Sequence, residues 1–170
     1  MNKEYIKKLT SEEFTDLSMP YLLDAHLLDE RKINDEDYKQ WLSQVLALER
    51  ERIAVLSDLP EAIKFAFTLP EYDVKMLVWK NSTPNEVKKI LTELAELLSN
   101  FSVQDWNAQN LEKKIGEWVE QNKYANGPVL WPLRVALSGQ DKSPGPYEIA
   151  AALGKDETIR RVQSAIDKLS

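Results

Sequence analysis

The chain has 170 residues, 43% of them hydrophobic, so it is long enough for one large domain or two small ones with a buried core. Its 22 basic and 28 acidic residues give a net charge of −6, which argues against a broad, nonspecific nucleic-acid-binding patch. It contains no cysteine, which excludes disulfides, thiol catalysis and thiolate zinc sites and favours a reducing compartment.

The sequence lacks the marks of a membrane or secreted protein. No apolar run approaches the roughly 18 residues of a membrane span, and the N-terminal sequence MNKEYIKK lacks the apolar core of a secretion signal. We therefore expect a cytoplasmic protein with no membrane partner. Residues 1–125 carry 16 basic and 23 acidic side chains, whereas residues 126–170 carry 6 and 5, so only the last part of the chain does not repel phosphate.

Apolar residues recur at helical spacing along the chain, and helix start and stop signals divide it. Thr10 and Glu13 form a capping box, Pro20 is expected to start a second helix and Asn34 to cap a third. The clearest helix follows Thr83 and carries apolar residues at spacings of three, four and seven. In order, we expect helices near residues 11–17, 20–28, 35–45, 48–56, 59–67, 84–101, 105–119, 132–138, 146–153 and 156–169.

No strand-like alternation of useful length, internal repeat or low-complexity run is present. The predicted fold class is therefore all-α, with about eight to ten short helices. We expect two packed subdomains, residues 1–101 and residues 102–170.

The sequence offers little for catalysis. His26 is the single histidine, so metal clusters and histidine-based nucleophilic catalysis have little to build on. The acidic run Asp35-Glu36-Asp37 diverges around a helix and suits a first helical turn, where the dipole favours acids. Neither common glycine-rich phosphate loop is present. We expect no catalytic, metal or cofactor site on this chain.

Residues 127–154 hold four of the eight prolines and four of the five glycines. We expect Pro132 to be the first residue of a short helix that ends at Gly139, followed by a tight loop and a helix that begins at Pro146. Arg134 then points away from the apolar side of the short helix, beside a stiff Ser-Pro-Gly-Pro turn. We predict that the functional surface of the chain lies around Arg134 and this turn.

Exposed aromatic side chains can stack on bases, so each tryptophan needs an assignment. Trp41, Trp106 and Trp118 lie in apolar helical patterns and are assigned to the core. Trp79 fits either the core or the surface. Trp131 is the best candidate for a surface platform.

Four segments follow one another in the second half of the chain: PLRVALSG at 132–139, SPG at 143–145, LGK at 153–155 and RR at 160–161. Their order and spacing resemble the end of bacterial-type glutamyl-tRNA synthetases, whose pattern is PLR.ALTG, (S/T)PG(L), LGKE and RR. Upstream, Asn2 opens a segment similar to the N-x-x-Y-I segment of the family, and residues 50–61 are similar to its arginine-bearing helix. The resemblance therefore covers the whole chain.

In that family the matching region is an all-helical cage that binds the anticodon loop of glutamate tRNA. Carried over by position, the resemblance implies that Arg134 reads the first anticodon base and that Ser143 with Pro144 holds the second. It implies that Arg52 recognises the third base, where cytosine is expected. Guanidinium donors suit the O2 and N3 acceptors of a pyrimidine, and a serine hydroxyl can both donate to and accept from uracil.

One position departs from the family pattern. Pro146 stands where the family usually has a leucine that packs on the middle base, so it supplies an apolar face but no amide donor. Trp131, Arg160 and Arg161 are further candidates for stacking or phosphate contact.

The catalytic nucleotide-binding domain of the family, with its HIGH and KMSKS motifs, is absent from this chain. We expect Met1 to begin a fragment, shortened or separately encoded, of a class I glutamate–tRNA ligase, with ATP and Mg²⁺ bound only in the missing domain. The resemblance implies a monomeric module that binds glutamate tRNA and not DNA. Such a module contributes selectivity and no catalytic chemistry. Whether the parent enzyme also charges glutamine tRNA stays open. The alternative is an α-helical protein-interaction scaffold without RNA binding, which the acidic residues 1–125 favour.

Overall fold

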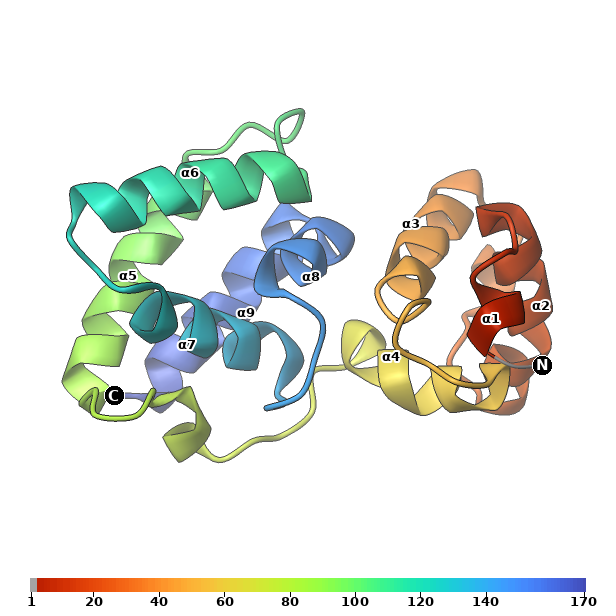
Figure 1. The fold of residues 1–170 in the computed structure, drawn as a ribbon, viewed down its shortest axis with the longest axis horizontal. Coiled ribbons are helices and arrows are strands. Elements are labelled where there is room, and N and C mark those ends of the chain that lie inside the picture. The colour runs from red at the N-terminus through yellow and green to blue at the C-terminus, as the bar shows by residue number, and fades with distance from the viewer. Residues whose placement is uncertain (1–2) are drawn as a thin grey trace. The chain divides into compact units, whose positions relative to one another are not determined.

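The computed structural model describes residues 3–170, which contain nine α-helices, three 3-10 helices and no strand (Figure 1). In chain order the elements are α1 (Lys3–Ile6), α2 (Ser11–Asp24), η1 (Glu30–Lys32), α3 (Glu36–Ala47), η2 (Leu56–Asp58), α4 (Leu59–Phe67), η3 (Val74–Leu77), α5 (Pro84–Ser99), α6 (Ala108–Gln121), α7 (Asn126–Ser138), α8 (Pro146–Leu153) and α9 (Lys155–Lys168). The all-α prediction is confirmed. Within the same residues, no helix is long and apolar enough to cross a lipid bilayer. Asn2 lies outside the described residues.

The chain divides into two compact units, Met1–Thr68 and Leu69–Ser170. The boundary predicted between residues 101 and 102 thus falls inside the second unit. The reason is the apolar face of α5, which buries Val87, Leu91 and Leu94 and packs against α9 and α7. A helix with such a face needs packing partners, and α5 finds them later in the chain.

Helix α2 begins as predicted, with Thr10 and Glu13 forming a capping box. The prediction that Pro20 starts a new helix is wrong, because α2 continues through it to Asp24. Pro20 is exposed, so water can reach the carbonyl one turn earlier that has lost its amide partner. Helices α2, α3 and α4 pack on one another in the first unit. The buried side chains of this unit include Ile6, Phe14, Leu22, Leu42, Leu46, Leu59 and Ile63.

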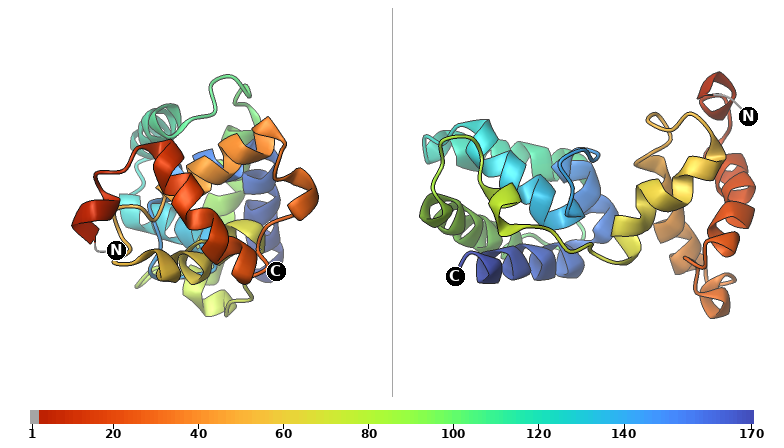
Figure 2. Two further views of the ribbon diagram at one scale, coloured as in Figure 1. Left: turned by 90° about the vertical axis from the view of Figure 1, so that its right-hand side faces the viewer. Right: turned by 90° about the horizontal axis from the view of Figure 1, so that it is seen from below.

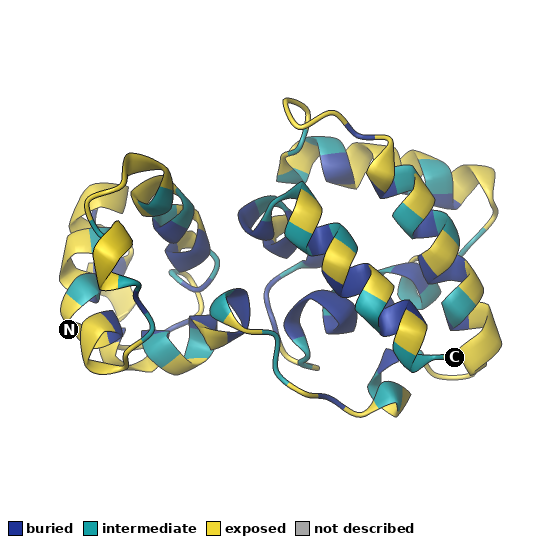
Figure 3. Cartoon of the chain, turned by 180° about the vertical axis from the view of Figure 1, so that it is seen from behind, coloured by how far each residue is buried: buried dark blue, intermediate teal, exposed yellow. Residues whose placement is uncertain are grey.

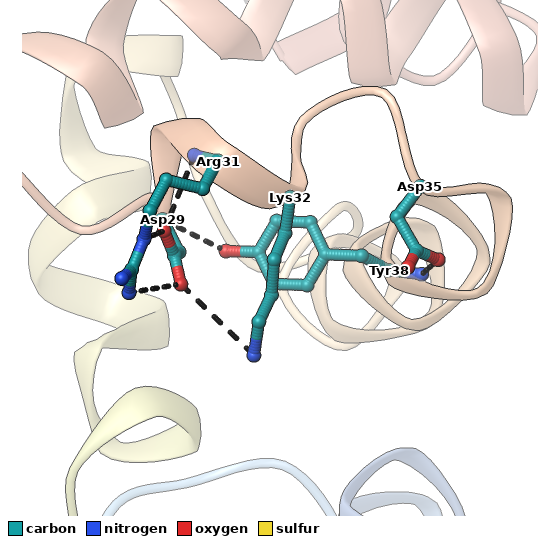
Figure 4. A network of polar contacts seen from close by, with 5 residues as sticks. All are labelled: Asp29, Arg31, Lys32, Asp35 and Tyr38. Atoms are coloured by element: carbon teal, nitrogen blue, oxygen red, sulfur yellow. Dashed lines mark hydrogen bonds and ion pairs between the residues drawn. The ribbon is translucent and has the colours of Figure 1, made fainter.

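Polar contacts hold the loop between α2 and α3 (Figure 4). The carboxylate of Asp29 accepts hydrogen bonds from the Arg31 amide at 3.2 Å and from Arg31 Nε at 2.9 Å, and the Asp29 amide donates to the Tyr38 hydroxyl at 3.2 Å. The side-chain hydrogen bond from Arg31 keeps the pKa of Asp29 below its usual value. Asp35, not the expected Asn34, caps α3, because its carboxylate accepts from two amides in the first helical turn.

In the second unit, α5 and α9 lie side by side and α7 packs against both (Figures 1 and 2). Helix α8 contacts α6, α7 and α9. Buried and exposed residues alternate along α9 in the manner of an amphipathic helix (Figure 3). Helix α7 is largely buried by these neighbours.

Helix α7 starts earlier than predicted. It begins at Asn126, so Pro132 lies inside the helix and the prediction that Pro132 opens it is wrong. A proline inside a helix costs about 3 kcal/mol, which burial of its neighbours in α7 offsets. Gly139 ends the helix as predicted, with a φ of 66°. A Cβ at this position would also lie 2.7 Å from Pro70 Cγ, so two constraints require glycine.

Arg161 of α9 is only 1% exposed and ties α9 to α7. Its Nε donates to Glu157 Oε1 at 2.7 Å and its Nη1 donates to the Leu137 carbonyl at 2.6 Å. That carbonyl lies in the last turn of α7, where carbonyls have no amide partner within the helix. Hydrogen bonds from Arg160 and then Arg161 lower the pKa of Glu157 to about 2.

Two tryptophans fix the start of α7 against the segment that contains η3. The ring centroids of Trp79 and Trp131 are 5.3 Å apart, and Trp131 Nε1 donates to the Met76 carbonyl at 2.8 Å. Gly127 leaves the space that Trp79 fills, because a Cβ at Gly127 would lie 2.4 Å from Trp79 Nε1. Glycine is needed at 127 because Trp79 fills the space that a Cβ would occupy, whereas at 139 the turn that ends α7 needs a positive φ.

Replacing Gly127 with alanine should destabilise the protein by about 1–3 kcal/mol, because the large Trp79 ring must leave a packed position. Gly116→Ala is a matched control: Gly116 is also helical, and no other atom lies within 4 Å of a Cβ added there. That variant should gain up to about 1 kcal/mol from helix propensity. Urea unfolding followed by circular dichroism measures both, and equal stabilities would contradict the packing role of Gly127.

The paired state of Glu157 predicts an acid-sensitive contribution to stability. Its pKa falls from a usual value of 4.5 to about 2 in the folded chain. A lowered acid pKa stabilises the folded state above the unfolded-state value, and this stabilisation is lost as pH falls from about 4.5 toward about 2. Glu157→Gln should therefore unfold more readily at neutral pH and lose less stability across this window. Glu117→Gln, at an exposed position of α6, is the control and should behave like the parent chain.

Candidate nucleic-acid interface

Three side chains predicted from the sequence line one hollow in the second unit. Arg134 and Trp131 come from α7, and Pro146 is the first residue of α8. The hollow has a volume of about 260 Å³, and its other lining residues are Trp79, Asn126, Gly127 and Leu130. We call it the Arg134 hollow. It combines one guanidinium group with mainly apolar and aromatic walls.

The guanidinium of Arg134 is available. The side chain is half-buried, and among residues 3–170 it forms no ion pair or hydrogen bond, whether with Glu148 or with another residue. Only the backbone of Arg134 is engaged, since its carbonyl accepts from Ser138 Oγ at 2.8 Å. All five N–H donors of the guanidinium are therefore free for a ligand.

Trp131 is a fixed wall and not a free platform. It is half-buried, its indole N–H is used by the Met76 carbonyl, and Trp79 packs against it. Trp79 carries a cation of its own, because Lys80 Nζ lies 4.7 Å from its ring centroid. Sequence reasoning left Trp79 undecided and did not identify Lys80.

The turn at residues 143–146 is folded inward. Ser143 is 5% exposed, and its hydroxyl donates to the Pro144 carbonyl at 3.0 Å. Pro144 and Pro146 are both buried, but of the three residues only Pro146 lines the Arg134 hollow. The structure thus brings Pro146 to Arg134, and it keeps the Ser143 hydroxyl within the turn.

Arg52 lies in the first unit and is held by an acid. Its Nε donates to Glu49 Oε2 at 2.9 Å, with the Glu49 side chain 8% exposed and that of Arg52 45% exposed. Burial raises the pKa of Glu49, and the charge of Arg52 counteracts this effect. The mixed charges around Arg52 in the sequence predicted a solvent-exposed face. Nothing in that charge pattern indicated that the Glu49 side chain is buried.

The two arginines of the terminal helix differ. Arg160 is exposed and binds Glu157 through two hydrogen bonds, at 2.8 and 2.7 Å. Arg161 lies in the core, so its predicted contact with phosphate does not fit its position. Lys155 also has a structural contact, because its Nζ donates to the carbonyls of Ser99, the last residue of α5, and of Phe101.

Comparison with known proteins gives one consistent family. The family model described as an anticodon binding domain matches residues 13–166. The glutamate–tRNA ligases of Clostridium acetobutylicum and Clostridium kluyveri are 34% and 35% identical to this chain, over 99% of it and 33% of their own length. The chain therefore spans about a third of the length of the curated relatives it matches.

Solved structures agree with this result. The crystal structure of a glutamate tRNA ligase from Elizabethkingia meningosepticum, in complex with its amino acid, has a TM-score of 0.75 and 26% identity. It covers 99% of this chain and 31% of that protein. The resemblance to glutamyl-tRNA synthetases is confirmed, and the protein-interaction scaffold is not favoured. The chain belongs to the family of anticodon-binding domains, in the form found in glutamate–tRNA ligases.

Proposed function

We propose that this chain binds the anticodon loop of glutamate tRNA as a monomer and gives a glutamate–tRNA ligase its selectivity, without taking part in the chemistry. The observation that carries the proposal is the unpaired Arg134 guanidinium within an aromatic and proline-lined hollow. ATP and Mg²⁺ belong, in this proposal, to the catalytic domain of the parent ligase.

Arg134 reads the first anticodon base. An unstacked loop base exposes its Watson–Crick edge, and two guanidinium N–H groups match the O2 and N3 acceptors of a pyrimidine. Trp131 supports the plane of that base, since its ring is fixed by the hydrogen bond to Met76. A rigid site of this kind loses little conformational entropy on binding.

The second base lies against the 143–146 turn. Because the Ser143 hydroxyl already donates to the Pro144 carbonyl, its role is to hold the turn. The hydroxyl oxygen keeps its capacity to accept a hydrogen bond. Pro146 provides the apolar face on which the base packs, in place of leucine.

Arg52 contacts the third base through the nitrogens that Glu49 leaves unused. Only Nε is engaged by Glu49, so both terminal NH₂ groups can donate to cytosine. The buried carboxylate orients the guanidinium and lowers the entropy lost on binding. Glu49 is therefore a positioning residue for Arg52.

Titration of the chain with a fluorescent anticodon stem-loop of glutamate tRNA tests the proposal. Binding should weaken as salt increases, with a slope in log Kd against log salt of about 0.7 for each phosphate contacted. Arg160→Ala should weaken all RNAs by a similar factor if Arg160 contacts phosphate. Absence of binding at low salt, or affinity independent of salt, would support a scaffold.

Removing the Arg134 guanidinium should reduce base selectivity. For Arg134→Ala we expect a loss of about 1–3 kcal/mol with the matching first base and a much smaller loss with a purine there. Competition titrations with stem-loops that differ only at this position measure the difference.

Arg31→Ala is the control, because Arg31 is an exposed arginine of the first unit and the substitution changes the net charge equally. It should not alter selectivity. An equal loss across all first bases for Arg134→Ala would refute base reading by Arg134.

A further inference from the structure

A second, larger hollow of about 610 Å³ adjoins the Arg134 hollow. It lies where the loop after η3 and the first turns of α5 meet the loop between α6 and α7. Trp79 lines both hollows, so the two share one aromatic wall. We call it the Lys80 hollow.

The cations of the Lys80 hollow are more available than its acids. Lys80 is exposed and has no carboxylate partner among residues 3–170, and Lys89 has only a long 3.9 Å ion pair with Glu93. The acid that lines the hollow, Glu86, accepts from the Thr83 amide at 2.7 Å, and Glu93, outside the lining, accepts from the Tyr124 hydroxyl at 2.9 Å. The hollow can therefore receive a phosphate in a chain whose net charge is −6.

Two tight turns border this hollow. Lys80 and Lys123 have φ values of 43° and 55°, and apart from His26 they are the only non-glycine residues with positive φ among the described residues. Lys123 directly precedes Tyr124, which lines the hollow. At Lys123 this conformation ends α6, where the Tyr124 amide donates to the Val119 carbonyl, and at Lys80 it forms a turn in which the Ser82 amide donates to the Trp79 carbonyl.

We propose that the Lys80 hollow binds the nucleotide on the 5′ side of the anticodon triplet, with its base on Trp79 and its phosphate beside Lys80 and Lys89. This inference rests on the proposed function, in which Arg134 reads the first base. In that proposal the second base packs on Pro146, and the opposite neighbour of the first base is assigned to Trp79 because Trp79 lines both hollows.

Binding requires Lys80 to move. Its ammonium now covers the Trp79 ring, an exposed cation–π contact worth about 0.5–1 kcal/mol. A base that stacks on the ring displaces the ammonium, which then pairs with the phosphate of the same nucleotide. The contact is independent of base identity, because every base has a face that can stack.

Stem-loop RNAs with an abasic site at the 5′-flanking position test the stacking. The abasic RNA should bind the parent chain about 5- to 100-fold more weakly. Trp79→Leu should weaken the intact RNA similarly and make the chain insensitive to the abasic change. Undiminished affinity of the parent chain for the abasic RNA would overturn the proposal.

Lys80→Gln tests the phosphate contact and leaves the packing of Trp79 on Trp131 in place, while it removes the cation–π contact of Lys80 with Trp79. It should weaken all triplets equally, lower the salt slope by about one and reduce the effect of a methylphosphonate at the flanking linkage, because Lys89 remains. Lys75→Gln, at an exposed lysine in η3, should do none of these. Equal behaviour of the two variants, with triplet selectivity intact, would overturn the inference alone. Absence of RNA binding by the parent chain would instead overturn the proposed function.

Discussion

The arrangement of the second unit depends on one buried charge. Arg161 donates to the carbonyl of Leu137, which has no amide partner at the end of α7, and thereby fixes α7 on α9. The turn at Gly139 follows at once, packed against Pro70, and the chain then returns to present Pro146 beside Arg134. A residue suggested by its motif to contact phosphate thus positions the proposed RNA-binding surface from inside the core.

Most helices of this chain could be predicted because their signals are local. Capping residues and apolar spacing suffice for the start of α2 and for α5, and the left-handed Gly139 suffices for the end of α7. Two errors fall at Pro20 and Pro132, where a helix-start rule competes with packing, and a third falls at residues 48–55, where turns and bends replace the expected helix. Burial of Leu133 and its neighbours favours a continuous α7 by more than the lost hydrogen bond costs. That gain depends on helices distant in the sequence, so no local pattern records it.

The residues of the candidate site also divide into those with a local sequence signal and those placed by tertiary packing. Arg134, Trp131 and Pro146 could be assigned because they lie in consecutive helices that match a known motif. Trp79 and Lys80 follow the short η3, which has no periodicity to interpret, and tertiary packing alone brings them to α7. The burial of Arg161 had one local signal, the spacing of four residues from Glu157 that pairs side chains on a helix, but burial itself is a tertiary property.

The two arginines assigned to bases begin from different states, and this decides how much each discriminates. Arg134 has no partner, so a wrong base leaves charged donors without acceptors in a mainly apolar hollow, which is costly. Arg52 keeps its hydrogen bond to Glu49 whichever base arrives, and its exposed NH₂ groups can return to water. A mismatch there loses little more than the contact itself. Selectivity in the proposed complex therefore rests more on the first anticodon base than on the third.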